Sequence, residues 1–411
     1  MDDLPDCMLL EILIRLPLKS IFQCKCVSHR WRSLISAPSF AYLVRLQASS
    51  IFRPPIVLLF NNQIRNRNSI KKFLVAPEES PEFDSLVSLI IQCNNNDSAE
   101  DTVHASCHDL LLCSKKMDAG SDSMTAYYML NPITRQSVAL PPLLQSSRRT
   151  WVGFVCYYND NINMVSYRVL RIPYFPGKYI FEFPKEFKVD IFSSDTGRWS
   201  ESVVLWPKGY LLNEYVFAGV PYNGLLFWLG KDGCVFGVDP CTGRCCRFFQ
   251  SPIESEEGLA LYHLEVCQGA LRMFEVSGLP LTVTEQRQSK LRVWELKDYD
   301  NEGGEWWMEH ELCFHQMVSE KSAWLTDYVR RGRNSPILVA MLACHPYDRD
   351  IVYVMIRGKI ISCNMRRKTL EVLCDHPYAE ARPDFYNGLT VCNLELSCWP
   401  TLIPSSPFLT E

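Results

Sequence analysis

The sequence predicts an α+β protein overall, in which a short N-terminal segment of three helices precedes a large all-β, propeller-like domain. Three observations support this prediction. Apolar residues recur at helical spacing in residues 1–46, whereas short apolar or alternating runs separated by turn residues continue from there to the C-terminus. A similar turn also recurs between several of these runs. The domains are therefore expected at residues 1–46 and 50–405.

Composition narrows the class of protein. The chain has 411 residues, of which 47% are hydrophobic and 21% are charged, and its net charge is −4. That apolar content excludes a mainly disordered chain. The net negative charge does not favour non-specific binding to nucleic acid, whose backbone is also negative. We therefore expect a globular protein with a sizeable core and no nucleic-acid partner.

Cysteine usage and the N-terminus suggest where the protein works. The 18 cysteines are too sparse for a disulfide-stapled scaffold. The start of the chain is acidic and has no apolar stretch, so it is not a signal peptide. The longest apolar run, near residues 337–344, is far shorter than the roughly 18 residues of a membrane span. We expect no membrane partner and a reducing compartment, the cytoplasm and/or the nucleus.

The first predicted helix has an apolar face and clear ends. Four residues form that face: Leu9, Ile12, Leu13 and Leu16. Asp3 or Asp6 could cap the helix, and Pro17 ends it. A second helix is expected over 18–25 and a third over 28–35. Because three short helices make a marginal core, the segment either caps the following domain or docks onto a partner.

Four motifs follow one another along this segment: Leu4-Pro5, LLEILIRLPLK at 9–19, CKCVSHRWRSLI at 24–35, and Pro38-Ser39-Phe40. Together they resemble an F-box of the plant type. This resemblance implies docking onto the Skp-family adaptor of an SCF-type ubiquitin ligase, and through it onto cullin. The adaptor-binding residues that it implies are Leu4, Pro5, Ile12, Leu13, Leu16, Pro17, Leu18, Val27, Trp31 and Leu34. A large aromatic such as Trp31 is the best candidate for a binding hot spot.

Strands are expected throughout the remainder. The clearest are at 56–60, 110–113, 127–130, 153–158, 165–172, 187–192, 225–229, 235–238, 291–296, 351–356 and 359–363. Two polar stretches, 92–102 and 114–125, are predicted to be exposed loops.

The repeated turn lies at 131–135, 194–198, 239–244 and 364–369. Thr196 and Thr242 are 46 residues apart, which is close to the ~40–50 residues of one four-stranded propeller blade. Thr134 and Thr196 are 62 apart, so the period is irregular. At that period the remainder would hold about six to eight blades. A β-sandwich with common turn chemistry is the alternative.

Several of these runs also resemble the F-box-associated domain, over about residues 107–374. The motifs are VGFVCY at 152–157, VDIFSSDTGRW at 189–199, NGLLFWLG at 223–230, LRVWEL at 291–296 and His345-Pro346. Asp109 stands where that family usually has glycine, so we expect Asp109 to adopt left-handed backbone geometry. The resemblance implies a domain that binds a protein substrate, without indicating the residues that do so.

Motifs for catalysis are missing, and no cofactor or metal is expected. There is no glycine-rich phosphate-binding loop, no nucleophile elbow and no group of protein-kinase motifs. His310 and His315 are five residues apart and would not share one helix face. His104, Cys107, His108 and Cys113 fit no zinc spacing and are interpreted as strand and turn positions.

Two basic clusters, at 330–333 and 366–368, could contact an acidic substrate or a phosphate, but the acidic balance favours solvated loops. A kelch array would repeat a double glycine in its blades, whereas this chain has the Gly303-Gly304 pair once. The predicted function is that of a non-catalytic substrate-recognition subunit of an SCF-type ubiquitin ligase, with an unknown protein substrate. The alternative is a binding module that acts outside the ligase and recognises a small molecule or a glycan.

Overall fold

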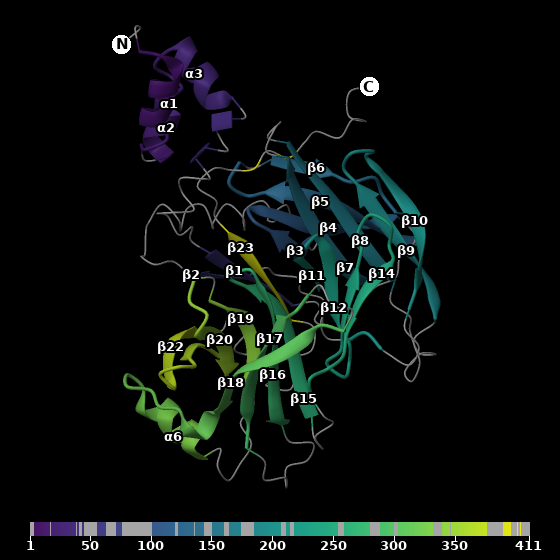
Figure 1. The fold of residues 1–411 in the computed structure, drawn as a ribbon, viewed down its shortest axis with the longest axis vertical. Coiled ribbons are helices and arrows are strands. Elements are labelled where there is room, and N and C mark those ends of the chain that lie inside the picture. Colours follow the sequence, from purple (N-terminus) through teal and green to yellow (C-terminus); the bar gives the residue numbers. More distant parts are fainter. Residues whose placement is uncertain are drawn as a thin grey trace.

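The structure is a computed structural model, and Figure 1 shows the arrangement of its elements. The residues that it describes are 4–16, 18–37, 39–40, 43–44, 56–62, 71–75, 101–119, 122–134, 136–143, 150–159, 164–173, 185–206, 211–213, 218–253, 259–279, 288–299, 303–331, 339–345, 347–375, 389–395, 401 and 403.

The N-terminal segment forms the three expected helices: α1 (Asp6–Leu13), α2 (Leu18–Cys24) and α3 (His29–Ser36). Five buried residues form its core: Leu13, Ile21, Ile35, Phe40 and Val44. Because the three helices are short, the core that they enclose is small.

Local signals set where α1 and α3 begin. Ser28 caps α3, because its Oγ accepts a hydrogen bond from the Trp31 N–H at 3.1 Å. The prediction that Asp6 caps α1 is wrong, since Pro5 is the capping residue and makes no side-chain capping bond. Asp6 lies in the first turn of α1 instead. Asp3, the other candidate, lies outside the described residues.

The described strands form six groups around a common centre, which we number as blades 1 to 6. Blade 1 contains β3 (Asp101–Cys107), β4 (Leu110–Ala119), β5 (Asp122–Asn131) and β6 (Gln136–Ala139). Blade 2 contains β7 (Thr150–Asn159), β8 (Met164–Pro173), β9 (Glu186–Ser193) and β10 (Arg198–Leu205). Blade 3 contains β11 (Ala218–Tyr222), β12 (Leu225–Leu229), β13 (Val235–Val238) and β14 (Cys245–Phe249). Blade 4 contains β15 (Leu259–Cys267), β16 (Ala270–Leu279), β17 (Lys290–Lys297) and β18 (Glu305–Cys313). Blade 5 contains β19 (Val339–Cys344), β20 (Ile351–Ile356), β21 (Lys359–Asn364) and β22 (Thr369–Asp375). Blade 6 contains β23 (Leu389–Glu395), β1 (Ile56–Asn62) and β2 (Lys71–Val75).

The first strand of each blade lies at the centre, and these inner strands form a closed ring. Going round it, β3, β7, β11, β15, β19 and β23 each contact the next, and β23 contacts β3. The propeller prediction is therefore confirmed over the sandwich alternative. The six described blades lie at the lower end of the expected range.

Blade 6 closes the ring by joining the two ends of the β domain. Its inner strand, β23, comes from the C-terminal part of the chain and pairs antiparallel with β1 from Ile56↔Glu395 to Asn62↔Leu389. Beyond β23, Thr401 and Ile403 are tied to blade 1. The Asp109 Oδ2 accepts the Thr401 N–H at 2.6 Å, and the Gln136 amide exchanges hydrogen bonds with the backbone of Ile403.

Blades 2 and 3 approach so closely that glycine is required at their junction. Their inner strands pair in parallel, with Gly153 opposite Gly219. A Cβ atom on Gly219 would lie 2.6 Å from the Trp228 ring, and one on Gly153 would lie 2.7 Å from it. The buried indole of Trp228 therefore fills the space that side chains at these two positions would need.

All eleven clearest predicted strands lie within observed strands. The repeated turn joins the two outer strands of blades 1, 2, 3 and 5, and its polar side chains bond to its own backbone. In blade 3, for example, Asp239 Oδ1 accepts the Cys241 N–H at 2.8 Å and Gly243 adopts φ 74°. The irregular period arises inside blade 2, where residues 174–185 separate β8 from β9.

Three expectations about the β domain are wrong. The predicted loop at 114–125 is a hairpin, in which Ser114 pairs with Tyr127 and Ala119 with Asp122. Asp109 does not adopt left-handed geometry, because the preceding residue, His108, does so at φ 52°. The basic residues Arg330 and Arg331 lie on a helix, α6 (Ala323–Arg331), and not in a loop. Of the other predicted loop, 92–102, Asp101 and Thr102 belong to β3 and the rest lies outside the described residues.

Candidate partner-binding surfaces

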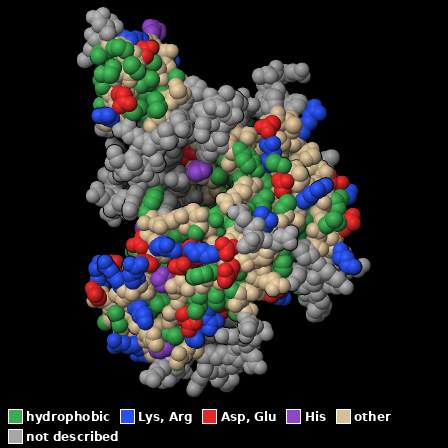
Figure 2. All heavy atoms as spheres, viewed as in Figure 1, with side chains coloured by type: hydrophobic (Ala, Val, Ile, Leu, Met, Phe, Trp, Pro, Cys, Tyr) green, Lys and Arg blue, Asp and Glu red, His purple; other side chains and the backbone are tan. Residues whose placement is uncertain are grey.

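The three helices leave large apolar side chains on the outside of their bundle. Met8 is 53% exposed, Ile12 49%, Phe22 41% and Val27 66%. Figure 2 shows hydrophobic side chains gathered on the visible face of this segment. Such a concentration on so small a bundle is typical of a surface that is covered by a partner. We call Met8, Ile12, Phe22 and Val27 the helical apolar surface.

The residues expected to bind an adaptor differ in their exposure. Pro5, Ile12 and Val27 are exposed, whereas Leu4, Leu16, Trp31 and Leu34 are partly buried. Leu13 is only 1% exposed and packs in the bundle core. Pro17 and the side chain of Leu18 lie outside the described residues. The structure contains no partner, so a contact role for each residue stays a prediction.

Sequence reasoning missed Met8 and Phe22. Met8 precedes Ile12 by four residues, so helical spacing could have placed both on one side of α1. Phe22 gave no such signal, because it lies on a short helix next to the buried Ile21. The Lys25 ammonium lies 5.2 Å from the centre of the Phe22 ring, which keeps a charge at the edge of this surface.

An arginine fixes the start of the chain against α3. The Arg30 guanidinium donates to Asp6 Oδ1 from Nε at 2.9 Å and from Nη2 at 2.7 Å, and it also donates to the Leu4 carbonyl. These bonds join the beginning of α1 to α3. The segment at Leu4 is thereby held against the first turn of α3.

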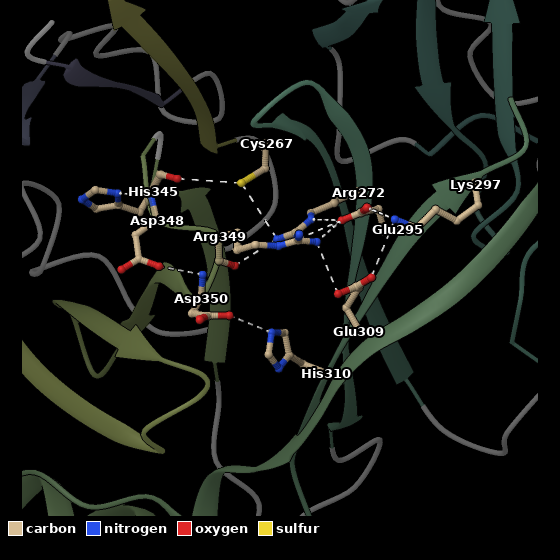
Figure 3. A network of polar contacts seen from close by, with 10 residues as sticks. All are labelled: Cys267, Arg272, Glu295, Lys297, Glu309, His310, His345, Asp348, Arg349 and Asp350. Carbon is tan, nitrogen blue, oxygen red and sulfur yellow. Dashed lines mark hydrogen bonds and ion pairs between the residues drawn. The ribbon is translucent and has the colours of Figure 1, made fainter. Parts of the chain in front are cut away.

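A polar network in the β domain lies between blades 4 and 5 (Figure 3). The buried Arg272 on β16 donates to Glu295 Oε2 from Nε at 2.9 Å and from Nη2 at 2.8 Å, and its Nη1 donates to the Arg349 carbonyl at 2.9 Å. Arg349 reaches back from blade 5 to the same Glu295 oxygen at 2.7 Å. Lys297 contacts the other oxygen of Glu295. The network therefore ties the two blades together.

Every charged group at the centre of this network has an opposite charge beside it. Burial raises the pKa of Glu295, but hydrogen bonds from Lys297 and Arg272 outweigh it and hold this pKa below its usual value. Burial lowers the pKa of His310, although the nearby Asp350 carboxylate, 3.3 Å away, opposes that shift. The charges of this network are therefore balanced by contacts within the protein itself.

The four residues considered for zinc occupy the expected strand and turn positions and have separate contacts. His104 Nε2 lies 2.7 Å from Ser114 Oγ, and burial lowers the pKa of His104 to about 4. A hydrogen bond with the Cys156 thiol lowers the pKa of Cys107 to about 7. Cys113 lies in a different apolar cluster. In the part of the chain that the structure describes, no group of three or more His, Cys, Asp or Glu residues could hold a metal ion.

None of the helices within the described ranges has the length and apolar character to cross a bilayer.

Comparison with known proteins identifies both parts of the chain. Residues 1–42 match the F-box domain, and residues 81–397 match the family described as "F-box protein At3g26010-like, beta-propeller". The F-box protein At5g07610 of Arabidopsis thaliana is 22% identical over 387 residues, which are 90% of this chain and 85% of that protein. The putative F-box protein At1g46840 of the same plant is 24% identical, over 78% of this chain and 61% of that protein.

A solved structure with related architecture is the β-propeller domain of the trilobed protease from Pyrococcus furiosus. It is 9% identical, over 67% of this chain and 71% of that one, with a TM-score of 0.32, which is too low to support an argument. The family matches cover both the helical segment and most of the β domain. The chain therefore belongs to the F-box proteins that carry an At3g26010-like β-propeller.

Proposed function

We propose that this protein is a substrate-recognition subunit of an SCF-type ubiquitin ligase. Its F-box docks onto a Skp-family adaptor, and through it onto cullin, while the propeller binds a protein substrate. The observation that carries the first half is the helical apolar surface, which the small core of the bundle leaves outside. Covering these side chains would remove apolar area from water and favour association.

The protein would contribute position and no bond chemistry of its own. Holding a substrate lysine near a ubiquitin-charged enzyme makes their encounter nearly intramolecular, which raises the effective concentration to about the millimolar range. The propeller suits that task because its ring is closed and a polar network joins blades 4 and 5. We also propose that it works in the cytoplasm and/or the nucleus, since all the cysteines that the structure describes have free thiols.

Co-purification with a Skp-family adaptor tests the docking step. Ile12→Asp and Val27→Asp each place a carboxylate in the helical apolar surface, and each should weaken adaptor binding by about tenfold or more. Ser33→Asp is the matched control, because it adds the same group at an exposed polar position of α3. It should bind as the wild type does.

Failure of the wild-type chain to bind any adaptor would contradict the ligase proposal. The F-box would then be a structural cap on the propeller, and the β domain would be a binding module that acts outside the ligase. An equal loss of adaptor binding in Ser33→Asp and Ile12→Asp would contradict the assigned surface, since a negative charge anywhere on the helices would then weaken binding.

A further inference from the structure

Helix α6 (Ala323–Arg331) interrupts the β domain between β18 and β19, on the outside of blade 5 (Figure 1). Leu325 and Val329 lie one turn apart and are fully buried in the apolar cluster between blades 4 and 5. Thr326 Oγ1 also accepts the Ser319 N–H at 2.8 Å, which fixes the approach to the helix. Packing therefore holds α6 rigidly against the propeller, and its opposite side faces water.

The outward side of α6 combines aromatic and basic residues. Trp324, Tyr328 and Arg331 follow at positions i, i+4 and i+7, so they lie along one stripe. Trp324 is 39% exposed. The Arg357 guanidinium, from the turn between β20 and β21, lies 5.0 Å from the centre of the Tyr328 ring. This stacking brings a second element of blade 5 into the same surface.

The arginines here make no ion pair within the described ranges, whereas several other cations in and beside blade 5 do. Three of those cations have carboxylate partners: Lys321 with Glu371 at 2.5 Å, Lys359 with Asp375 at 2.5 Å, and Arg366 with Asp350 at 2.8 Å. Arg330, Arg331 and Arg357 are exposed, and none has an ion pair with another described residue. Asp327, one turn before Arg331, is too far away to pair with it. Figure 2 shows Lys and Arg side chains gathered over this part of the molecule.

We infer that Trp324, Tyr328, Arg330, Arg331 and Arg357, which we call the α6 surface, bind an acidic segment of the protein substrate. Guanidinium groups bind carboxylates and phosphates through paired hydrogen bonds. The exposed Trp324 and the partly buried Tyr328 supply apolar contact at little entropic cost. Positive charge on a chain whose net charge is −4 also steers an acidic segment to this one place. The inference rests on the proposed function, because it assigns where a substrate of the ligase subunit would bind.

The test uses the full-length chain bound to its adaptor and measures the fluorescence anisotropy of labelled peptides. The probes are a peptide rich in Asp and Glu around one leucine, its phosphoserine counterpart, and a neutral version with Asn and Gln. Arg330→Glu/Arg331→Glu reverses two charges on the α6 surface. Arg367→Glu/Lys368→Glu reverses two charges on the turn between β21 and β22, at the opposite end of β21, and is the matched control.

The wild type should bind one or both acidic peptides and not the neutral one, and salt should weaken this binding. The α6 variant should lose about tenfold or more in affinity, and the control should stay within about twofold. Whether the carboxylate or the phosphate peptide binds more tightly identifies the anion. Both variants should unfold at the wild-type temperature, because the exchanged side chains are exposed.

Three results would overturn the inference. The first is no binding of either acidic peptide, and the second is an equal loss of peptide affinity in the two variants. The third is tighter binding of a single-stranded oligonucleotide than of the peptides, with the α6 variant losing affinity for the oligonucleotide as well. Failure of the proposed function is distinguishable from these. It appears as loss of adaptor co-purification by the wild-type chain, which leaves peptide binding by the free chain measurable.

Discussion

Replacing Arg272 by methionine tests whether the network between blades 4 and 5 stabilises the propeller. Methionine keeps the length and apolar contacts of the side chain but removes its charge. The variant loses the two bonds to Glu295 and leaves the Arg349 carbonyl without that donor. Breaking a buried ion pair from one side costs about 3–5 kcal/mol of unfolding free energy. Because Glu295 keeps Lys297 and Arg349, we expect about 3 kcal/mol.

For a chain of this size, that loss corresponds to a fall of roughly 3–4 °C in the unfolding temperature, measured by differential scanning fluorimetry. Arg366→Met is the matched control. It removes an arginine that also pairs with a carboxylate, but the Arg366 side chain is 76% exposed, so the cost should stay below about 1 kcal/mol. The reasoning would be refuted if Arg272→Met unfolded within about 1 °C of the wild type, or if the two variants lost equal stability.

The dependence on pH gives a second readout of the same bonds. The folded-state pKa of Glu295 is below its usual value, so the ion pair stabilises the protein at pH values above the unfolded-state pKa, about 4.3. This stabilisation is lost as the pH falls through the lowered folded-state pKa. The difference between wild type and Arg272→Met should therefore be largest near neutrality and shrink below about pH 4.

Three more outcomes are expected. Gly219→Ala should destabilise the junction of blades 2 and 3 by about 1–3 kcal/mol, because its Cβ would meet the Trp228 ring at 2.6 Å. Gly303→Ala is the control, since no described atom lies within 4 Å of its Cβ, and it should unfold near the wild-type temperature. Asp109→Ala should loosen the C-terminal segment at Thr401 and speed its removal in a proteolysis time-course followed by mass spectrometry. Unchanged cleavage would show that the bonds from Asn131 and Gln136 suffice to hold the segment. Burial lowers the folded-state pKa of His104 to about 4, so the unfolded chain binds the extra proton first and the unfolding temperature should fall between pH 6.5 and 4. His104→Gln should flatten that part of the profile, and an unchanged slope would assign it to other groups.

Elements with local signals were predictable from the sequence. Ser28 begins α3 through a hydrogen bond to its own hydroxyl oxygen. The repeated turn is likewise encoded in residues that bond to each other, such as Asp239 and Thr242. Helix α6 carried a weak signal in the spacing of Leu325 and Val329. That spacing was overlooked because nine residues between strands offer little periodicity.

The features missed from sequence depend on distant partners. The segment 114–125 is polar in sequence, and it forms a hairpin because β4 and β5 pair from Leu111↔Leu130 to Ala119↔Asp122. Nothing near Arg272 in the sequence indicates Arg349, which lies in the next blade. The helical apolar surface was predicted in part, from motif positions, but only the bundle's packing separates the exposed Ile12 from the buried Leu13.

The closure of the ring by β23 has a consequence during synthesis of the protein. The F-box and β1 leave the ribosome first, but β1 cannot gain its inner partner until the last part of the chain has been made. A product that stops before β23 would carry the helices that we propose dock onto the adaptor, together with an unclosed propeller. Such a fragment would occupy adaptor molecules without presenting a folded substrate domain, and so would oppose the full-length protein in the same cell.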